Sequence, residues 1–147
     1  IILTTTSGTR ALIRSKKAEW VLVGAFINAE AVADKAQEIA EKEKINITLV
    51  ASGRRGRFSL EDFLCAGAII ENLSNNKANL SDSALAAVLS FRQARERLYE
   101  NISRGEHARH LVSLGLKRDV EFCSRLNCYE TVPVYKDGAI TAFDQYS

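Results

Sequence analysis

The sequence predicts an α/β fold, a three-layer α/β/α sandwich around a mostly parallel (mixed) sheet with a C-terminal β-hairpin. Short apolar runs alternate with longer helical stretches, the pattern of an α/β domain. Glycine-containing turns follow apolar runs at two points and open helices, as in strand-loop-helix units. Near the end, Asp137-Gly138 separates two short runs of strand-forming residues, a strong hairpin signal.

Composition and charge set limits on the class of protein. The chain has 147 residues, 46% of them hydrophobic and 26% charged, so we expect residues 1–147 to form a single α/β domain. The 20 Lys and Arg nearly balance the 18 Asp and Glu, and no apolar run approaches the ~20 residues of a membrane span. We therefore expect no nucleic-acid partner and no membrane. The three cysteines form no C-x-x-C pair, which favours reduced thiols in a cytoplasmic protein.

Three apolar runs are candidate strands of the parallel sheet. They occupy residues 1–4, 19–23 and 45–51. The second, E-W-V-L-V, is nearly continuous in its apolar residues, as strands buried on both faces are. A possible further strand spans 120–125, and the hairpin strands are expected at 131–135 and 139–143.

Helical patterns fill the spaces between these runs. The expected helices are 9–17, 28–44, 59–73, 81–101 and 106–114. In the second, Val32, Ala36 and Ile39 share one face. The third is apolar almost all round, which indicates a buried helix. Gly115 fits a glycine stop after the last helix.

The first strand-loop-helix junction has the features of an anion site. Free backbone N–H groups and the positive dipole end at a helix start attract anions. Hydroxyl groups, a glycine and a guanidinium stand there, so the candidate substrate-binding residues are Thr6, Ser7, Gly8, Thr9 and Arg10. The same pattern is equally that of simple Ser or Thr capping beside a surface Arg. The G-K-[ST] ending of a Walker A loop is absent.

The second junction combines glycines, three arginines and two adjacent carboxylates. Gly53, Arg54 and Gly56 are candidate substrate-binding residues, because guanidinium groups suit phosphate, sulfonate and carboxylate oxygens. Glu61 and Asp62 are candidate catalytic and Mg²⁺-binding residues, since Mg²⁺ prefers one or two carboxylates plus substrate phosphate. If the preceding strands are parallel, both junctions face one crevice.

A structural explanation of the same carboxylates stays open. Ser59-x-x-Asp62 is a capping-box pattern, and acidic residues in a first helical turn stabilise the helix dipole. The arginines are then a solvated loop.

Four further residues are weaker candidates. Asn28, after another strand, is an N-cap that would also face the crevice as a substrate-binding residue. His107 and His110 lie three apart on a predicted helix, but two histidines alone make a poor metal site, so a surface or packing role is favoured. Cys65 lies in an apolar helix and is expected to be a small buried hydrophobe.

Three ordered motifs resemble one enzyme family. They are T-T-T-S-G-T-R-A-L at 4–12, G-A-F-I-N-A at 24–29 and G-R-R-G-R-F-S-L-E-D-F-L-C-A-G-A at 53–68. Together they resemble the 2-phosphosulfolactate phosphatases of coenzyme M biosynthesis in methanogens, with relatives in many bacteria. Ser7 stands where that family usually has Asn.

The resemblance implies an activity. It is the Mg²⁺-dependent hydrolysis of (R)-2-phospho-3-sulfolactate to 3-sulfolactate and phosphate, with Glu61 or Asp62 as metal ligand or as the base that orients water. The substrate is a small polyanionic phosphoester, whose binding requires several converging donors. Two alternatives remain, a non-catalytic anion-binding α/β domain and a phosphatase of another small phosphoester.

The resemblance also implies an incomplete unit. It covers nearly the whole chain but only the later part of such a protein, so we expect the C-terminal part of a longer phosphatase. Family members carry an earlier segment with an Asp-containing strand end and Gly-rich motifs. We expect a homo-oligomer or association with this N-terminal segment, and a chain without that segment would be inactive if it carries catalytic groups.

Overall fold

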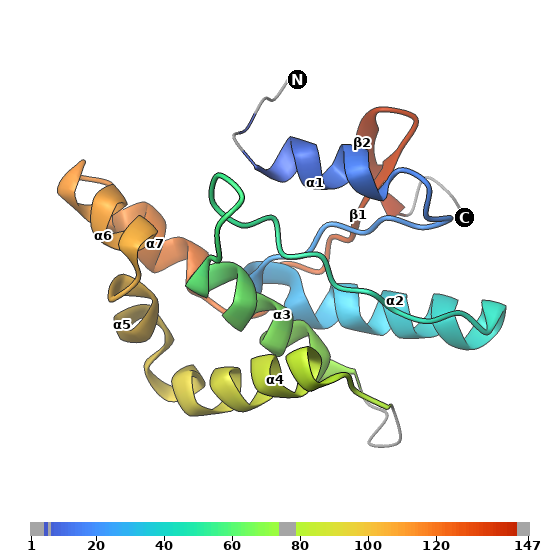
Figure 1. Ribbon diagram of the computed structural model, residues 1–147, viewed down its shortest axis with the longest axis horizontal. Coiled ribbons are helices and arrows are strands. Elements are labelled where there is room, and N and C mark those ends of the chain that lie inside the picture. Colours follow the sequence, from blue (N-terminus) through green and yellow to red (C-terminus); the bar gives the residue numbers. More distant parts are fainter. Residues whose placement is uncertain (1–4, 6, 74–78, 144–147) are drawn as a thin grey trace.

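The computed structural model describes residue 5, residues 7–73 and residues 79–143, and helices dominate this part of the chain (Figure 1). The α-helices are α1 Gly8–Ser15, α2 Ala29–Glu43, α3 Leu60–Asn72, α4 Asp82–Ala94, α5 Leu98–Ser103, α6 Glu106–Ser113 and α7 Lys117–Cys123. Two 3₁₀ turns are η1 Phe26–Asn28 and η2 Arg95–Arg97, and the strands are β1 Pro133–Lys136 and β2 Ala139–Ala142.

Helix α3 lies at the centre, with α2 on one side and α4 on the other (Figure 1). Its Leu64 and Ala68 are buried together with Ala33 of α2 and Phe91 of α4, as expected for a helix that is apolar almost all round. Gly67 allows the closest approach, because a Cβ built there would lie 2.2 Å from the carbonyl oxygen of Ala87 in α4. The core therefore depends on a small residue where two helix backbones meet.

The C-terminal hairpin is confirmed. β1 and β2 pair antiparallel, and Asp137 (φ 51°) and Gly138 (φ 83°) form the two-residue turn. On the other edge of β1, Val23 N–H donates to the Pro133 carbonyl and Tyr135 N–H donates to the Val21 carbonyl, both at 2.8 Å. The expected strand at 19–23 is thus reduced to a single antiparallel bridge beside β1.

Several expected elements are wrong. The segment 45–51 is extended but forms no ladder with a described neighbour, and the side chains of Ile45, Ile47 and Val50 are exposed. Residues 120–125 are not a strand, because α7 covers most of them and buries Val120. The long helix expected at 81–101 breaks at η2, where the chain turns into α5.

The expected helices at 9–17, 28–44, 59–73 and 106–114 are confirmed within one to two residues at each end, as α1, α2, α3 and α6. The expected strand at 1–4 lies outside the described residues. The described part is therefore a mixed helix-and-strand fold with a C-terminal hairpin, and its sheet consists of the two antiparallel strands β1 and β2. The mostly parallel sheet and the three layers are not confirmed within this part of the chain. No helix within the described ranges is long and apolar enough to cross a membrane.

Candidate functional site

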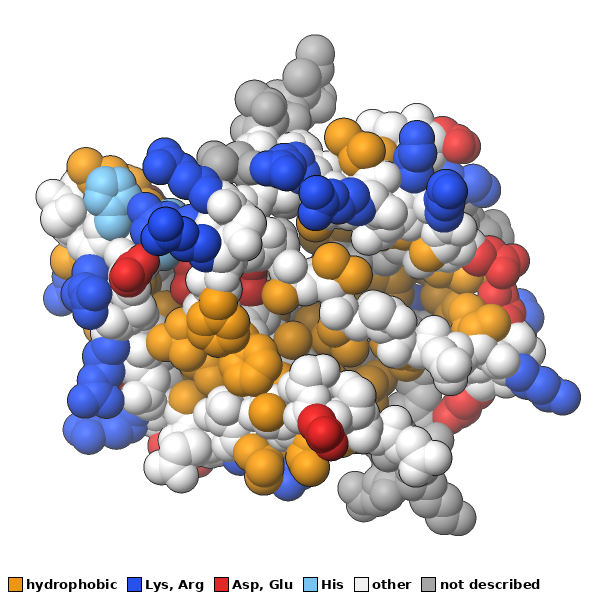
Figure 2. Space-filling model, viewed as in Figure 1, with side chains coloured by type: hydrophobic (Ala, Val, Ile, Leu, Met, Phe, Trp, Pro, Cys, Tyr) orange, Lys and Arg blue, Asp and Glu red, His pale blue; other side chains and the backbone are white. Residues whose placement is uncertain are grey.

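A cavity of about 640 Å³ opens between the start of α1, the loop before α3, the start of α3, and helices α6 and α7. It brings together Ser7 and Gly8 from the first junction with Gly53 and Arg54 from the second. Figure 2 shows Lys and Arg side chains along the upper edge of this face, over α1, the 53–57 loop and α6. The N-termini of α1 and α3 therefore face one space, and its wall carries the guanidinium groups of Arg54 and Arg55 beside the carboxylates of Glu61, Asp62 and Asp119.

A hydrogen bond joins the two junctions directly. Arg55 N–H donates to Ser7 Oγ at 3.2 Å. Ser7 is available because another residue satisfies the first turn of α1: Thr9 N–H donates to Thr5 Oγ1 at 3.0 Å, and Thr9 Oγ1–H donates to the Thr5 carbonyl at 3.1 Å. The two segments that the sequence places 48 residues apart thus lie side by side.

The loop before α3 is a tight turn. Arg54 N–H donates to the Arg57 carbonyl at 3.0 Å, and Arg57 N–H returns a bond to the Arg54 carbonyl at 2.9 Å. Its central residues, Arg55 (φ 52°) and Gly56 (φ 79°), are both left-handed. Gly53 is also left-handed (φ 68°), and a Cβ there would lie 2.6 Å from the Arg57 carbonyl oxygen. Glycine at 53 therefore allows the loop to close.

Asp62 fixes this loop onto α3. Its Oδ2 accepts a hydrogen bond from Gly53 N–H at 2.6 Å and another from Ser52 Oγ at 3.0 Å. Its own N–H donates to Ser59 Oγ at 3.3 Å, so Ser59 is the N-cap that the capping-box pattern predicts. The carboxylate of Asp62, however, reaches out to the glycine loop, so Ser59 caps the helix while Asp62 orders the loop.

Glu61 differs from Asp62 in its partners. It lines the cavity, is half-buried, and makes no hydrogen bond or ion pair with any described residue. Its two oxygens and the remaining oxygen of Asp62 are the hard donors that Mg²⁺ prefers. No group of three or more His, Cys, Asp or Glu side chains that could hold a metal occurs among the described residues. Mg²⁺ usually keeps several water ligands, so two carboxylates fit its needs.

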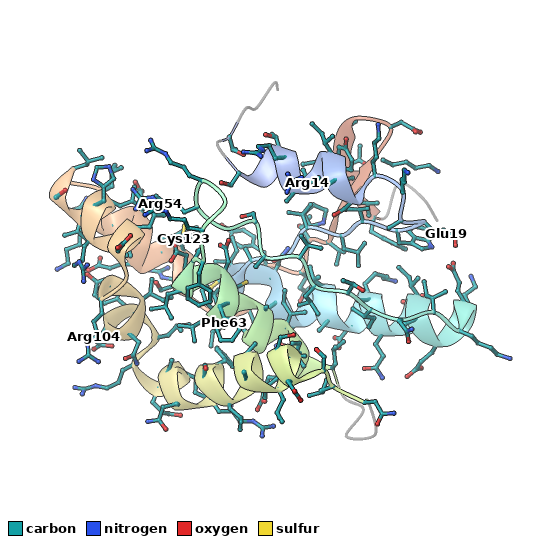
Figure 3. The ribbon with its side chains drawn as sticks, in the orientation of Figure 1. Arg14, Glu19, Arg54, Phe63, Arg104 and Cys123 are labelled. Atoms are coloured by element: carbon teal, nitrogen blue, oxygen red, sulfur yellow. The ribbon has the colours of Figure 1, made fainter. Side chains whose placement is uncertain are left out.

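Charged and sulfur groups complete the cavity wall. Arg54 Nη1 lies 4.0 Å from Glu106 Oε2, and both side chains are exposed, so this ion pair adds little stability. Figure 3 shows Arg54 extending from its loop toward α6 and α7, where Cys123 also lies. Burial, and secondly the charge of Asp62, raises the pKa of Cys65 to about 12. Cys65 therefore stays a thiol and packs against the core, as its apolar setting predicts.

Several predicted site residues do not line this cavity. Thr9, Arg10 and Gly56 lie next to its lining residues without forming part of the wall, and Thr6 lies outside the described residues. The roles predicted for all four in substrate binding remain predictions.

Asn28 is the N-cap residue of α2, as its sequence pattern predicts, but its side chain makes no capping hydrogen bond to that helix. Its Oδ1 accepts from Ala25 N–H at 2.8 Å, and its Nδ2 donates to the carbonyls of Thr131 at 3.0 Å and Val23 at 3.3 Å. The buried amide joins three chain segments and borders a separate cavity of about 290 Å³.

Sequence patterns did not place the far wall of the cavity, although His107 and His110 were weak candidates for a metal pair. Helices α6 and α7 contribute His107, His110, Asp119 and Cys123. The His-x-x-His spacing was the available signal for the two histidines. Their approach to α3 depends on how α5, α6 and α7 turn back on one another, which local patterns do not specify.

Comparison with known proteins identifies one family. The family model described as 2-phosphosulpholactate phosphatase matches residues 1–138. A "Probable 2-phosphosulfolactate phosphatase" of Thermotoga petrophila is 40% identical over 138 residues, covering 94% of this chain and 57% of that protein. The "2-phosphosulfolactate phosphatase" of Methanothermobacter thermautotrophicus is 37% identical over 145 residues, covering 99% of this chain and 60% of that protein.

The chain thus spans a little under three fifths of the first of these relatives, and its match extends over nearly all of its own length. The match includes every segment that forms the cavity, from Thr5 to Ser124. The chain belongs to the 2-phosphosulfolactate phosphatase family.

Proposed function

We propose that the protein containing this chain is a Mg²⁺-dependent phosphatase that hydrolyses (R)-2-phospho-3-sulfolactate to 3-sulfolactate and phosphate. One observation carries the proposal beyond family membership: the cavity that Ser7, Gly8, Gly53 and Arg54 share. A substrate with a phosphate, a sulfonate and a carboxylate on three carbons needs donors from several directions, because an anion without partners is costly to bury.

Each of the two loops would bind a different anionic group of the substrate. The start of α1 offers backbone N–H groups and a positive dipole end. The 53–57 loop offers the guanidinium of Arg54, whose planar fork matches phosphate, sulfonate and carboxylate oxygens. The Arg55–Ser7 hydrogen bond would keep the two donor sets at a fixed separation, which lowers the entropy lost on binding.

Glu61 and Asp62 would hold the Mg²⁺. When bound, the ion would supply charge neutralisation at the phosphoryl oxygens. Glu61 is the stronger candidate ligand, because no described residue occupies its oxygens. Asp62 would act mainly through its bond to Gly53 N–H, which holds the loop in the conformation that presents Arg54.

We also propose how the chain fits into the larger fold. The extended segment 45–51 has exposed apolar side chains, and 21–23 already bridges to β1. Both are suited to join the mostly parallel sheet of a three-layer sandwich. The relatives are longer than this chain, so the partner would be a further segment of the same protein, or a second copy.

Phosphate release from (R)-2-phospho-3-sulfolactate, with and without Mg²⁺, tests the proposal in the longest natural form of the protein. We expect turnover that EDTA abolishes and that Glu61→Gln lowers by at least about 100-fold. Asp34→Asn, an exposed carboxylate on α2 outside the cavity, is the matched control. Turnover of a different phosphoester only would reassign the substrate. Anion binding without turnover of any phosphoester would favour a non-catalytic domain.

A further inference from the structure

His107 occupies a specific place in the cavity wall. It is the second residue of α6 and lines the cavity. This end of α6 lies close to the candidate site. A Cβ built on Gly105 would lie 3.8 Å from the Cβ of Leu60, the first residue of α3, and Glu106 Oε2 lies 4.0 Å from Arg54 Nη1 of the glycine loop.

The imidazole of His107 has an unsatisfied atom. Its Nδ1 is buried and has no hydrogen-bond partner among the described residues. A buried polar atom without a partner costs about 1–3 kcal/mol, and such atoms in native proteins are often associated with function. The next residue, Ala108, is buried in the core, so this turn of helix is anchored with its histidine against the cavity. His110, one turn later, is exposed.

Hydrolysis of an alkyl phosphate requires a proton donor. The leaving group is an alkoxide, a strong base, and its departure is easier when it is protonated as the bond breaks. The guanidinium groups of Arg54 and Arg55 do not release protons. Carboxylates that hold a cation, as proposed for Glu61 and Asp62, have none to give.

The thiol beside these carboxylates is no better suited to the task. Burial raises the pKa of Cys65 to about 12, so this thiol is too weak an acid to donate a proton near neutral pH. Imidazole is the side chain best suited to gain and lose a proton near neutral pH.

We propose that His107 is the general acid of the phosphatase reaction, an inference that rests on the proposed function. The imidazolium donates a ring N–H proton to the ester oxygen as the bond between that oxygen and phosphorus breaks. The electron pair of that bond goes to the ester oxygen. The oxygen of water forms the new bond to phosphorus, and one water proton returns through solvent to the imidazole. The products are the alcohol and phosphate.

Charged groups on several elements lie in or beside the cavity wall that includes His107. They lie on the glycine loop, on α3, on α7 and on its own helix: Arg54, Arg55, Glu61, Asp62, Asp119 and Glu106. A pH optimum alone therefore does not isolate its role, and the test uses the leaving group instead.

His107→Gln is assayed with two substrates, (R)-2-phospho-3-sulfolactate and 4-nitrophenyl phosphate. Nitrophenolate leaves without a proton, so the loss of a general acid affects only the alkyl ester. We expect kcat for the alkyl ester to fall by about 10²–10⁴-fold and kcat for the aryl ester to change by less than about threefold. Equal losses on both substrates, or no loss on either, would overturn the assignment.

A second measurement is independent of turnover and does not use the His107→Gln variant. The chain has two histidines, so its imidazole C–H proton signals are few, and His110→Gln identifies which belong to His107. On titration with inorganic phosphate, we expect the His107 signals to shift with the same midpoint as the amide signal of Gly53. A shift at Gly53 with none at His107 would overturn the assignment.

The two proposals fail in different ways. A wild-type protein that hydrolyses no phosphoester overturns the proposed function and the role of His107 with it. An active wild-type protein whose His107→Gln variant does not distinguish the two substrates overturns the role of His107 alone.

Discussion

The hydroxyl of Ser7 accepts a hydrogen bond from the backbone N–H of Arg55 at 3.2 Å, across 48 residues of sequence. Each residue belongs to a junction whose sequence is compatible with simple helix capping. Their contact makes the two junctions parts of one cavity wall. The spacing between the helix start and the arginine loop is then set by the protein before any anion binds.

Removing the Ser7 hydroxyl tests the importance of this link. In Ser7→Ala, Arg55 N–H loses its acceptor, but the bond is exposed, so the free energy of unfolding should fall by no more than about 1 kcal/mol. The dissociation constant for inorganic phosphate, measured by calorimetry, should nevertheless rise several-fold. Ser15→Ala, at the other end of α1, is the control. Unchanged affinity in Ser7→Ala would show that the link does not position the loop.

Two glycines of the loop should respond differently to alanine. Gly53 and Gly56 both have left-handed φ, so alanine at either costs about 1–2 kcal/mol of conformational strain. At Gly53 the new Cβ would also lie 2.6 Å from the carbonyl oxygen of Arg57, whereas nothing lies within 4 Å at Gly56. Urea unfolding should therefore show Gly53→Ala to be the less stable variant. The reverse order would mean that the loop has another conformation in solution.

Substitutions at Asp62 and Glu61 should have different effects, the first on the free energy of unfolding and the second on Mg²⁺ binding. Asp62→Ala removes the acceptor for Gly53 N–H and Ser52 Oγ, so we expect a loss of about 1.5–3 kcal/mol in the free energy of unfolding. Glu61→Gln removes no contact with a described residue and should change stability by less than about 0.5 kcal/mol. It should weaken Mg²⁺ binding measured by calorimetry. Full Mg²⁺ affinity in Glu61→Gln would exclude Glu61 as a ligand.

Cys65 should remain unreactive where other thiols react. Burial and the charge of Asp62 raise its pKa from 9.0 to about 12, while Cys123 and Cys128 are exposed. Because the thiolate is the nucleophile, iodoacetamide at pH 8 should label Cys123 and Cys128 and spare Cys65. Mass spectrometry of proteolytic peptides gives the result, and rapid labelling of Cys65 in the folded protein would contradict the raised pKa.

The same pKa shift implies a direction for stability against pH. The fold disfavours the Cys65 thiolate, so its contribution is fully present below pH 9 and is lost as pH rises toward 12. Cys65→Ala removes this dependence, and the difference in urea midpoint between wild type and variant should shrink above pH 9. A constant difference across this range would contradict the shift.

Local signals predicted the helices and the hairpin well. α2 and α3 have clear apolar faces, and the Asp137-Gly138 turn is sufficient to predict the hairpin of β1 and β2. Each of these features depends only on residues that are close together in the sequence. The segments at 45–51 and 120–125 were not predictable in this way. A strand needs a partner elsewhere in the chain, and no described partner pairs with 45–51, while 117–123 buries only Val120 and forms a helix.

The candidate site was predictable in part for the same reason. Ser7, Gly8, Gly53, Glu61 and Asp62 lie in junction motifs whose residue types indicate anion or metal binding. His107 and Asp119 reach the cavity only through the packing of α6 and α7, which no local motif specifies.

One titration tests the central claim, that the two junctions form a single anion site. Isotope-labelled protein is titrated with inorganic phosphate, and the backbone amide signals of Gly8 and Gly53 are followed by NMR. A single site predicts that both signals shift with the same dissociation constant, and that Ser7→Ala weakens both together. A shift at one residue without the other, or two different dissociation constants, would contradict the claim.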